Sequence, residues 1–143
     1  MKAFTFRLEQ ALRWRQTQVD LQKSRVAGAV CRVAEIGAIL KPLKAGLSSA
    51  AADIIHESSG GALDSYAGFR ERSRARIHDC EAQAAVAQRT LTLEMNRLIE
   101  ANQKVRLLEN LRRTHRGRWH TGFERELAAF ADEAFLCRIQ SKT

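Results

Sequence analysis

The chain has 143 residues, the size of one ordinary domain, and its 24 Lys and Arg against 16 Asp and Glu give a net charge of +8. A single Pro and an aromatic content of 6% argue against a β-sandwich or barrel, which needs frequent turns. No uncharged stretch approaches the ~18–20 apolar residues that cross a bilayer, and charged residues interrupt the N-terminus where a signal peptide has its apolar core. We therefore expect a soluble, cytoplasmic protein.

Apolar residues recur every seven positions through the first part of the chain: Leu12, Val19, Val26, Val33, Leu40, Leu47 and Ile54. A companion row holds Leu8, Arg15, Gln22, Ala29, Ile36, Leu43 and Ala50. Two rows at spacings of three and four form one stripe on a helix, which a coiled-coil partner covers. The pattern predicts a helix over about residues 4–57, in which Pro42 produces a kink and no termination.

The strongest helix breaker is Glu57-Ser58-Ser59-Gly60-Gly61, which predicts a turn at about residues 58–61 with left-handed glycines. The heptads then resume and predict a second helix over about residues 62–137. Its two rows are Leu63, Ile77, Ala84, Leu91, Leu98 and Val105, and Tyr66, Cys80, Ala87, Ala101 and Leu108. Glu94 interrupts the second row, and we expect Met95 to substitute for it.

Two amphipathic helices joined by a short loop predict an all-α fold, a single antiparallel coiled-coil hairpin over residues 1–143. With the turn centred at Gly60, Leu8 should lie near Arg112, and the residues beyond should overhang or fold back. In the same register Trp14 and Trp119 need not touch.

The excess positive charge lies in two segments, residues 1–26 with a net charge of +4 and residues 102–125 with +5. The hairpin would bring these segments side by side. We interpret the resulting cationic end as a docking site for an acidic surface or pore, where its field would speed encounter. An ordinary solvated basic surface is the alternative.

No motif supports catalysis, since the sequence lacks a P-loop, GxSxG, HExxH and a Gly-rich dinucleotide turn. Cys31, Cys80 and Cys137 have no disulfide or metal spacing, so we expect free, semi-buried thiols. His115 and His120, five residues apart, would be splayed on a helix. We predict a protein that is not an enzyme and has no metal or cofactor.

Nucleic-acid binding is the main alternative function. The arginine-rich runs over residues 70–76 and 112–118 could both contact phosphates. Glu71, Asp79 and Glu81 cancel much of the charge of the first run. A generic secretion chaperone is a further possibility.

Short motifs at both ends resemble the FliJ family, the coiled-coil component of the flagellar type III export apparatus. Residues 4–15, FTFRLEQALRWR, resemble its FxLxxLLxxR start, and residues 108–113, LENLRR, resemble its LExLxxR motif. Ala131-Asp132-Glu133-Ala134 is similar to DExA, and Tyr66 and Phe69 to its YxxF patch. The injectisome relatives of the YscO type are similar in shape and length.

The resemblance implies a hairpin similar to the central stalk of rotary ATPases, at the cytoplasmic face of the inner membrane. Its implied partners are the hexameric export ATPase (FliI-like), the export gate protein (FlhA-like) and export chaperones. We expect the ATPase contacts at Arg7, Arg13, Arg15, Arg112, Arg113, Arg116 and Arg118. For the gate contact, Tyr66 and Phe69 are the matched positions, although either aromatic could pack in the seam.

Overall fold

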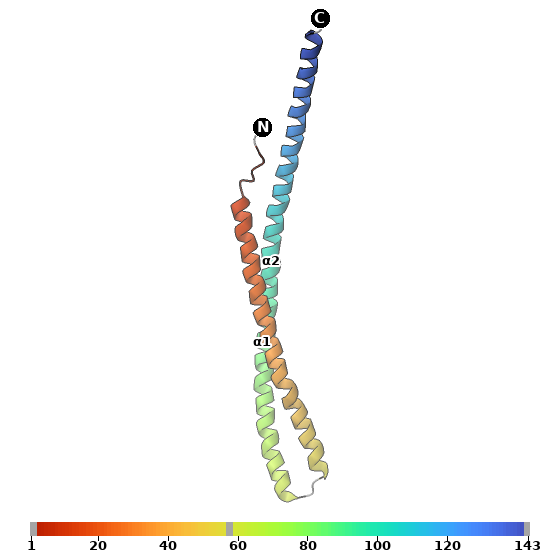
Figure 1. The fold of residues 1–143 in the computed structure, drawn as a ribbon. Coiled ribbons are helices and arrows are strands. Elements are labelled where there is room, and N and C mark those ends of the chain that lie inside the picture. The colour runs from red at the N-terminus through yellow and green to blue at the C-terminus, as the bar shows by residue number, and fades with distance from the viewer. Residues whose placement is uncertain (1–2, 57–58, 142–143) are drawn as a thin grey trace. The chain divides into compact units, whose positions relative to one another are not determined.

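A computed structural model describes residues 3–56 and 59–141, which form two α-helices, α1 over Glu9–His56 and α2 over Gly60–Gln140 (Figure 1). No strand occurs among these residues. The all-α class and the pair of long helices predicted from the heptads are confirmed. Neither helix combines the length and apolarity that a membrane span requires.

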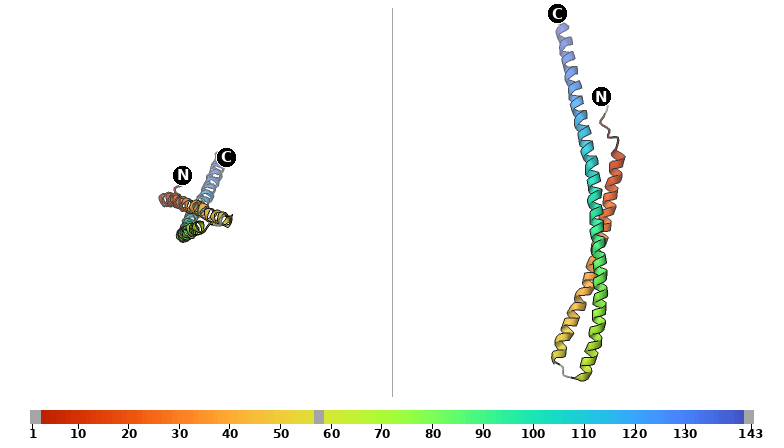
Figure 2. Two further views of the ribbon diagram at one scale, coloured as in Figure 1. Left: turned by 90° about the horizontal axis from the view of Figure 1, so that it is seen from below. Right: turned by 180° about the vertical axis from the view of Figure 1, so that it is seen from behind.

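The chain divides into two compact units, and each contains part of both helices. The terminal unit comprises Met1–Val19 and Glu100–Thr143, and the hairpin unit comprises Asp20–Ile99. Within each unit the α1 segment runs antiparallel to the α2 segment, as the right view of Figure 2 shows. Each unit is described by itself below, and the single hairpin domain over residues 1–143 stays a prediction.

In the terminal unit, a thin core lies between the start of α1 and the second half of α2. Phe6, Leu12, Val19 and Val105 are buried, and the side chain of Leu12 is only 1% exposed. Ala101 and Leu108 flank Val105 and are half-buried. Leu12, Val19 and Val105 belong to the predicted heptad rows, so the stripe does face the opposite helix.

In the hairpin unit, the described members of both heptad rows except Leu63 are buried or half-buried, with Ile36, Ala87 and Gln22 the most buried. Two details of the prediction are wrong. Leu63 is 53% exposed, and Ala62 is half-buried instead. Met95 is 50% exposed, whereas Glu94 itself occupies the seam, because its carboxylate finds hydrogen-bond donors there.

Helix α1 begins at Glu9, five residues later than predicted. Phe4, Thr5 and Phe6 are not helical, and the backbone N–H of Glu9 donates to the carbonyl of Phe6 at 3.1 Å. Phe4 and Phe6 both contact aromatic side chains of α2. Residues two apart point to different sides of a helix, so a helical start could not make both contacts.

Helix α2 begins at Gly60 inside the predicted turn. The Ser59 hydroxyl accepts a hydrogen bond from the backbone N–H of Ala62 at 3.3 Å and therefore caps the helix. Gly60 and Gly61 form its first turn, and no described glycine has a positive φ. The predicted left-handed glycine is therefore not found there, and Glu57 and Ser58 lie outside the described residues.

Pro42 lies inside α1, which continues on both sides of it, so the prediction that it does not terminate the helix is confirmed. Its side chain is exposed. The ring removes one backbone hydrogen bond and crowds the preceding turn. The seam residues Leu40 and Leu43 remain half-buried around it, which keeps the stripe in phase.

The last part of α2 has no helix beside it in the terminal unit (Figure 1). All residues from Glu124 to Gln140 are exposed. Of the two predicted outcomes, overhang and folding back, the structure has the overhang. We call residues 123–140 the tail of α2.

Candidate docking surface

Aromatic side chains hold the N-terminal segment against α2 in the terminal unit. The rings of Phe4 and Trp119 lie 6.1 Å apart at 56°, and those of Phe6 and His115 lie 6.0 Å apart edge to face. Trp119 also stacks on Phe123 at 5.3 Å. Such ring pairs add to the burial of apolar area. The cluster anchors the non-helical segment that precedes α1.

Trp14 of α1 is exposed. The guanidinium of Arg15 lies 4.8 Å from the centre of its ring, within cation–π range. Trp119, by contrast, pairs with Phe4 and Phe123. The expectation that the two tryptophans need not touch therefore agrees with their separate partners.

Glu9 joins two of the predicted docking arginines. Its carboxylate lies 3.4 Å from Arg112 Nη1 on α2 and 3.8 Å from Arg13 on α1. The prediction that Leu8 lies near Arg112 is therefore correct to within one residue, because Glu9 makes the contact. Because Glu9 partly neutralises both cations, Arg112 and Arg13 contribute less free charge to a partner than their number suggests.

Four more of the predicted docking arginines have no acidic partner in the part of the chain that the structure describes. Among the described residues, Arg7, Arg113, Arg116 and Arg118 form no ion pair, and all four are exposed. The whole terminal unit has 13 Lys and Arg and 7 Asp and Glu, a net charge of +6, and the hairpin unit has +2. The expected concentration of positive charge beside the chain termini is therefore confirmed.

Shallow hollows lie on this surface, and two of them are lined by predicted docking arginines together with Glu9 or Glu109. One, of about 500 Å³, is lined by Phe4, Thr5, Phe6, Glu9, Arg112 and Arg116. The other, of about 340 Å³, is lined by Glu109, Arg112, Arg113 and Arg116. Both combine guanidinium groups with little enclosure. This geometry suits carboxylate side chains of a macromolecule better than a small ligand, which needs a deeper cavity.

Tyr66 and Phe69 lie in the hairpin unit, three residues apart near the start of α2. Tyr66 is half-buried at a seam position, and Phe69 is 39% exposed. A partner could therefore reach Phe69 more easily than Tyr66. No described contact assigns either ring a role beyond packing.

A polar layer crosses the seam of the hairpin unit. Gln22, only 7% exposed, donates through Nε2 to the backbone carbonyl of Glu94 at 3.0 Å and to its Oε2. The other carboxylate oxygen of Glu94 accepts from Arg97 at 2.8 Å. Sequence reasoning missed this layer because it placed Gln22 in an apolar row without assigning it a partner and treated Glu94 as an interruption of the other row. Their occurrence at seam positions was the available signal.

A second link between the helices of this unit is the ion pair of Lys44 and Glu81, whose charged atoms lie 2.7 Å apart. The hydrogen bond from Lys44, and then its charge, hold the pKa of the Glu81 carboxyl below its ordinary value of 4.5. Both side chains are about half exposed, so solvent screens the pair.

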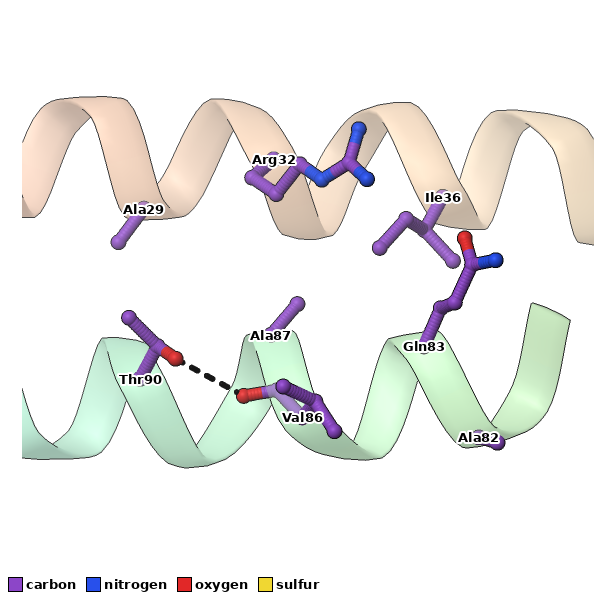
Figure 3. A pocket seen from close by; sticks show the side chains of 8 residues that line it. All are labelled: Ala29, Arg32, Ile36, Ala82, Gln83, Val86, Ala87 and Thr90. Atoms are coloured by element: carbon purple, nitrogen blue, oxygen red, sulfur yellow. Dashed lines mark hydrogen bonds between the residues drawn. The ribbon is translucent and has the colours of Figure 1, made fainter. Parts of the chain in front are cut away.

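An apolar groove of about 410 Å³ lies between α1 and α2 in the hairpin unit (Figure 3). Small side chains open it, since Ala29 faces Thr90 and Ala87, as the close view shows. Arg32 is its one charged lining residue, and Thr90 donates its hydroxyl to the backbone of Val86 at 3.0 Å. The groove lacks the converging polar groups of a catalytic or cofactor site.

The cysteines agree only in part with the expected semi-buried thiols. All three are free, but Cys31 and Cys137 are exposed, and only Cys80 is half-buried at the seam. Within the described ranges, no group of three or more His, Cys, Asp or Glu is placed to hold a metal ion. Comparison of the chain with protein-family models, curated proteins and solved structures gave no match.

Proposed function

We propose that this chain is a non-catalytic docking component of a type III protein export apparatus. In this function the cationic surface of the terminal unit would bind the export ATPase ring, promote its assembly and stimulate its activity. The observation that carries the proposal is the convergence of the N-terminal segment, the start of α1 and residues 112–118 of α2 in one cationic unit. The resemblance to FliJ proteins supplies the identity of the partner.

The exposed arginines suit such a role. Arg113, Arg116 and Arg118 follow one another on α2 and pair with no described acidic group, so they keep their full charge for a partner. An acidic pore would attract this unit from a distance. A contact of this kind biases the conformations of a ring only if it differs between those conformations.

The other partners follow from the same proposal. Export chaperones would bind the exposed helix faces, and the export gate protein would contact Phe69, with Tyr66 beside it. Such partners would bring the chain to the cytoplasmic face of the inner membrane. Flagellar and injectisome systems would use the surface in the same way.

The test is stimulation of the export ATPase of the same organism by the purified chain. Replacing Arg113, Arg116 and Arg118 by Glu should abolish stimulation and leave the helical circular-dichroism signal unchanged. This triple variant is preferable to one that includes Arg112, because a Glu at 112 would face Glu9 and disturb the fold. The matched control replaces Arg70, Arg72 and Arg74, three exposed arginines on α2 of the hairpin unit.

Stimulation by the triple variant equal to that of the parent chain would contradict the proposal. The same proteins distinguish the nucleic-acid alternative, which the unpaired arginines also favour. Tight duplex binding at physiological salt with a steep salt dependence, lost in the same variant, would support that alternative. A chain that binds export substrates and leaves the ATPase unaffected would instead be a secretion chaperone.

A further inference from the structure

The tail of α2 carries an apolar stripe that no described helix or segment covers beyond Phe123. Its members follow one another at alternating steps of four and three: Phe123, Leu127, Phe130, Ala134 and Cys137. At about 100° per residue these positions lie on one side of the helix. Leu127 is 52% exposed and Phe130 is 73% exposed. Large apolar side chains so spaced are typical of a helix that packs against another helix.

The stripe continues an interface that already exists in the terminal unit. Counting about 100° per residue from Ala101, Val105 and Leu108, the same side of α2 arrives at Trp119 and then at the tail. Up to Trp119 this side is covered, first by α1 and then by the N-terminal segment through Phe4. Beyond Phe123 the cover ends while the apolar pattern persists.

We propose that the tail pairs with the tail of a second copy of this chain in an antiparallel two-helix contact. Reversing the tail against itself opposes Leu127 to Cys137 and Phe130 to Ala134, each pair twice. Large residues thereby meet smaller ones in every layer, as close packing requires. Ala131 lies beside the stripe, on one flank of the contact. There it meets Ala131 of the second copy near the two-fold axis, where a small residue allows close approach. The contact is isologous and closes after two copies.

The charges beside the stripe support the reversed alignment. On one flank Glu124 and Arg138 lie near opposite ends of the tail, so each copy brings its Glu124 to the other's Arg138. Glu124 also lies 3.3 Å from His120 Nδ1 on the preceding turn, which leaves its second oxygen for the partner. On the other flank, Glu133 would face its own copy, an unfavourable contact that limits the strength of the dimer.

A parallel alignment is disfavoured by the covered part of α2. It would place the two copies of α1 and of the N-terminal segment along the same line, because both cover the side that carries the stripe. In the antiparallel alignment, the covered part of each copy lies past the end of the other's tail. The arrangement therefore needs no change in the described fold.

The first test is sedimentation equilibrium of the full chain over a wide concentration range. We expect a reversible dimer whose dissociation constant rises at least about tenfold in the double variant L127E and F130E. The matched control is F135E with L136E, two exposed apolar residues of the tail that lie off the stripe. It should leave the dimer unchanged. A chain that is monomeric at all concentrations, or a dimer equally weakened by both variants, would overturn the proposal.

The alignment is tested by charge reversal. E124R and R138E should each weaken the dimer, and the two together should restore it, whereas E133Q should tighten it. Cross-linking gives a second measure after C31S and C80S remove the other thiols. Oxidation of Cys137 alone should give little linked dimer, and L127C should give a strong increase. Efficient linkage through Cys137 alone would show a parallel pair and contradict the inference.

This inference does not rest on the proposed export function. The ATPase assay reports on the arginines of residues 113–118, and sedimentation reports on the stripe of the tail. If the parent chain is monomeric and the L127E and F130E variant no longer stimulates the ATPase, the stripe binds the ATPase. That result would overturn the dimer. Whether the chain dimerises or is monomeric, the effect of the arginine variants on ATPase stimulation is decided separately.

Discussion

Gln22 of α1 donates its side-chain amide to both the backbone carbonyl and the carboxylate of Glu94 of α2, inside a mainly apolar seam. Glu94 is one helical turn from position 98, which the predicted register places opposite Gln22. A buried polar pair of this kind costs stability relative to apolar packing but selects one register, because a shifted helix would leave both groups unpaired.

We predict that Gln22→Leu destabilises the chain by roughly 1–3 kcal/mol, since it leaves one carboxylate oxygen of Glu94 without its donor. The double variant with Glu94→Leu should recover most of this loss or exceed the parent chain, as replacement of a whole buried polar pair often does. Urea unfolding of the single and double variants measures both effects. Gln88→Leu, at an exposed position of α2, is the control.

If Gln22→Leu and Gln88→Leu lowered the free energy of unfolding equally, the hydrogen bonds of the polar layer would contribute nothing measurable to stability. Disulfide trapping between introduced cysteines at flanking seam positions would report on the register. The double variant should give several cross-linked registers where the parent gives one.

Phe6 should stabilise the start of α1 although it lies outside the helix. It is buried against His115, and its carbonyl accepts the N–H of Glu9. Phe6→Ala should cost about 1.5–3 kcal/mol, the value of burying such a side chain, and this cost should be local. Hydrogen exchange should become faster in the first turns of α1. Thr5→Ala, at an exposed neighbour, should leave exchange unchanged, and the same change in both variants would be evidence against the anchor.

Pro42 is predicted to weaken α1. Pro42→Ala should restore a backbone donor and raise the free energy of unfolding by up to about 3 kcal/mol. Gly37→Ala and Gly46→Ala are comparison variants on either side, since an added Cβ meets no atom within 4 Å at either site. Each should add about 1 kcal/mol. Thermal unfolding followed by circular dichroism ranks the three variants by their gain in stability. A smaller gain from Pro42→Ala than from either glycine variant would contradict the prediction and show that the backbone geometry imposed by Pro42 stabilises α1.

The Lys44–Glu81 pair should give a small acid dependence of stability. Because Lys44 lowers the pKa of Glu81 in the folded chain, the pair stabilises the fold above the ordinary value of 4.5. This contribution is lost as the pH falls through the lowered folded value. In Lys44→Gln, the NMR titration of Glu81 should move back toward its ordinary value, and the stability difference from the parent should vanish in acid. Lys41→Gln should leave the titration unchanged.

The sequence by itself determined the helical class, the pair of long helices and the side of each that faces the other. The heptad positions run from Leu12 to Ile54 and from Tyr66 to Leu108. Their spacing of seven residues places the apolar side chains on one side of each helix, and this follows without knowledge of the partner helix. The uneven charge was equally visible. These features need only composition and spacing.

Only the tertiary structure decided which residues meet across the seam. The non-helical start at Phe4 and Phe6 depends on aromatic partners more than a hundred residues away, and local propensity cannot report them. The pairing of Gln22 with Glu94, and the neutralisation of Arg112 by Glu9, depend on register to within one turn. Register depends on packing between the two helices, so it is a property of the folded chain.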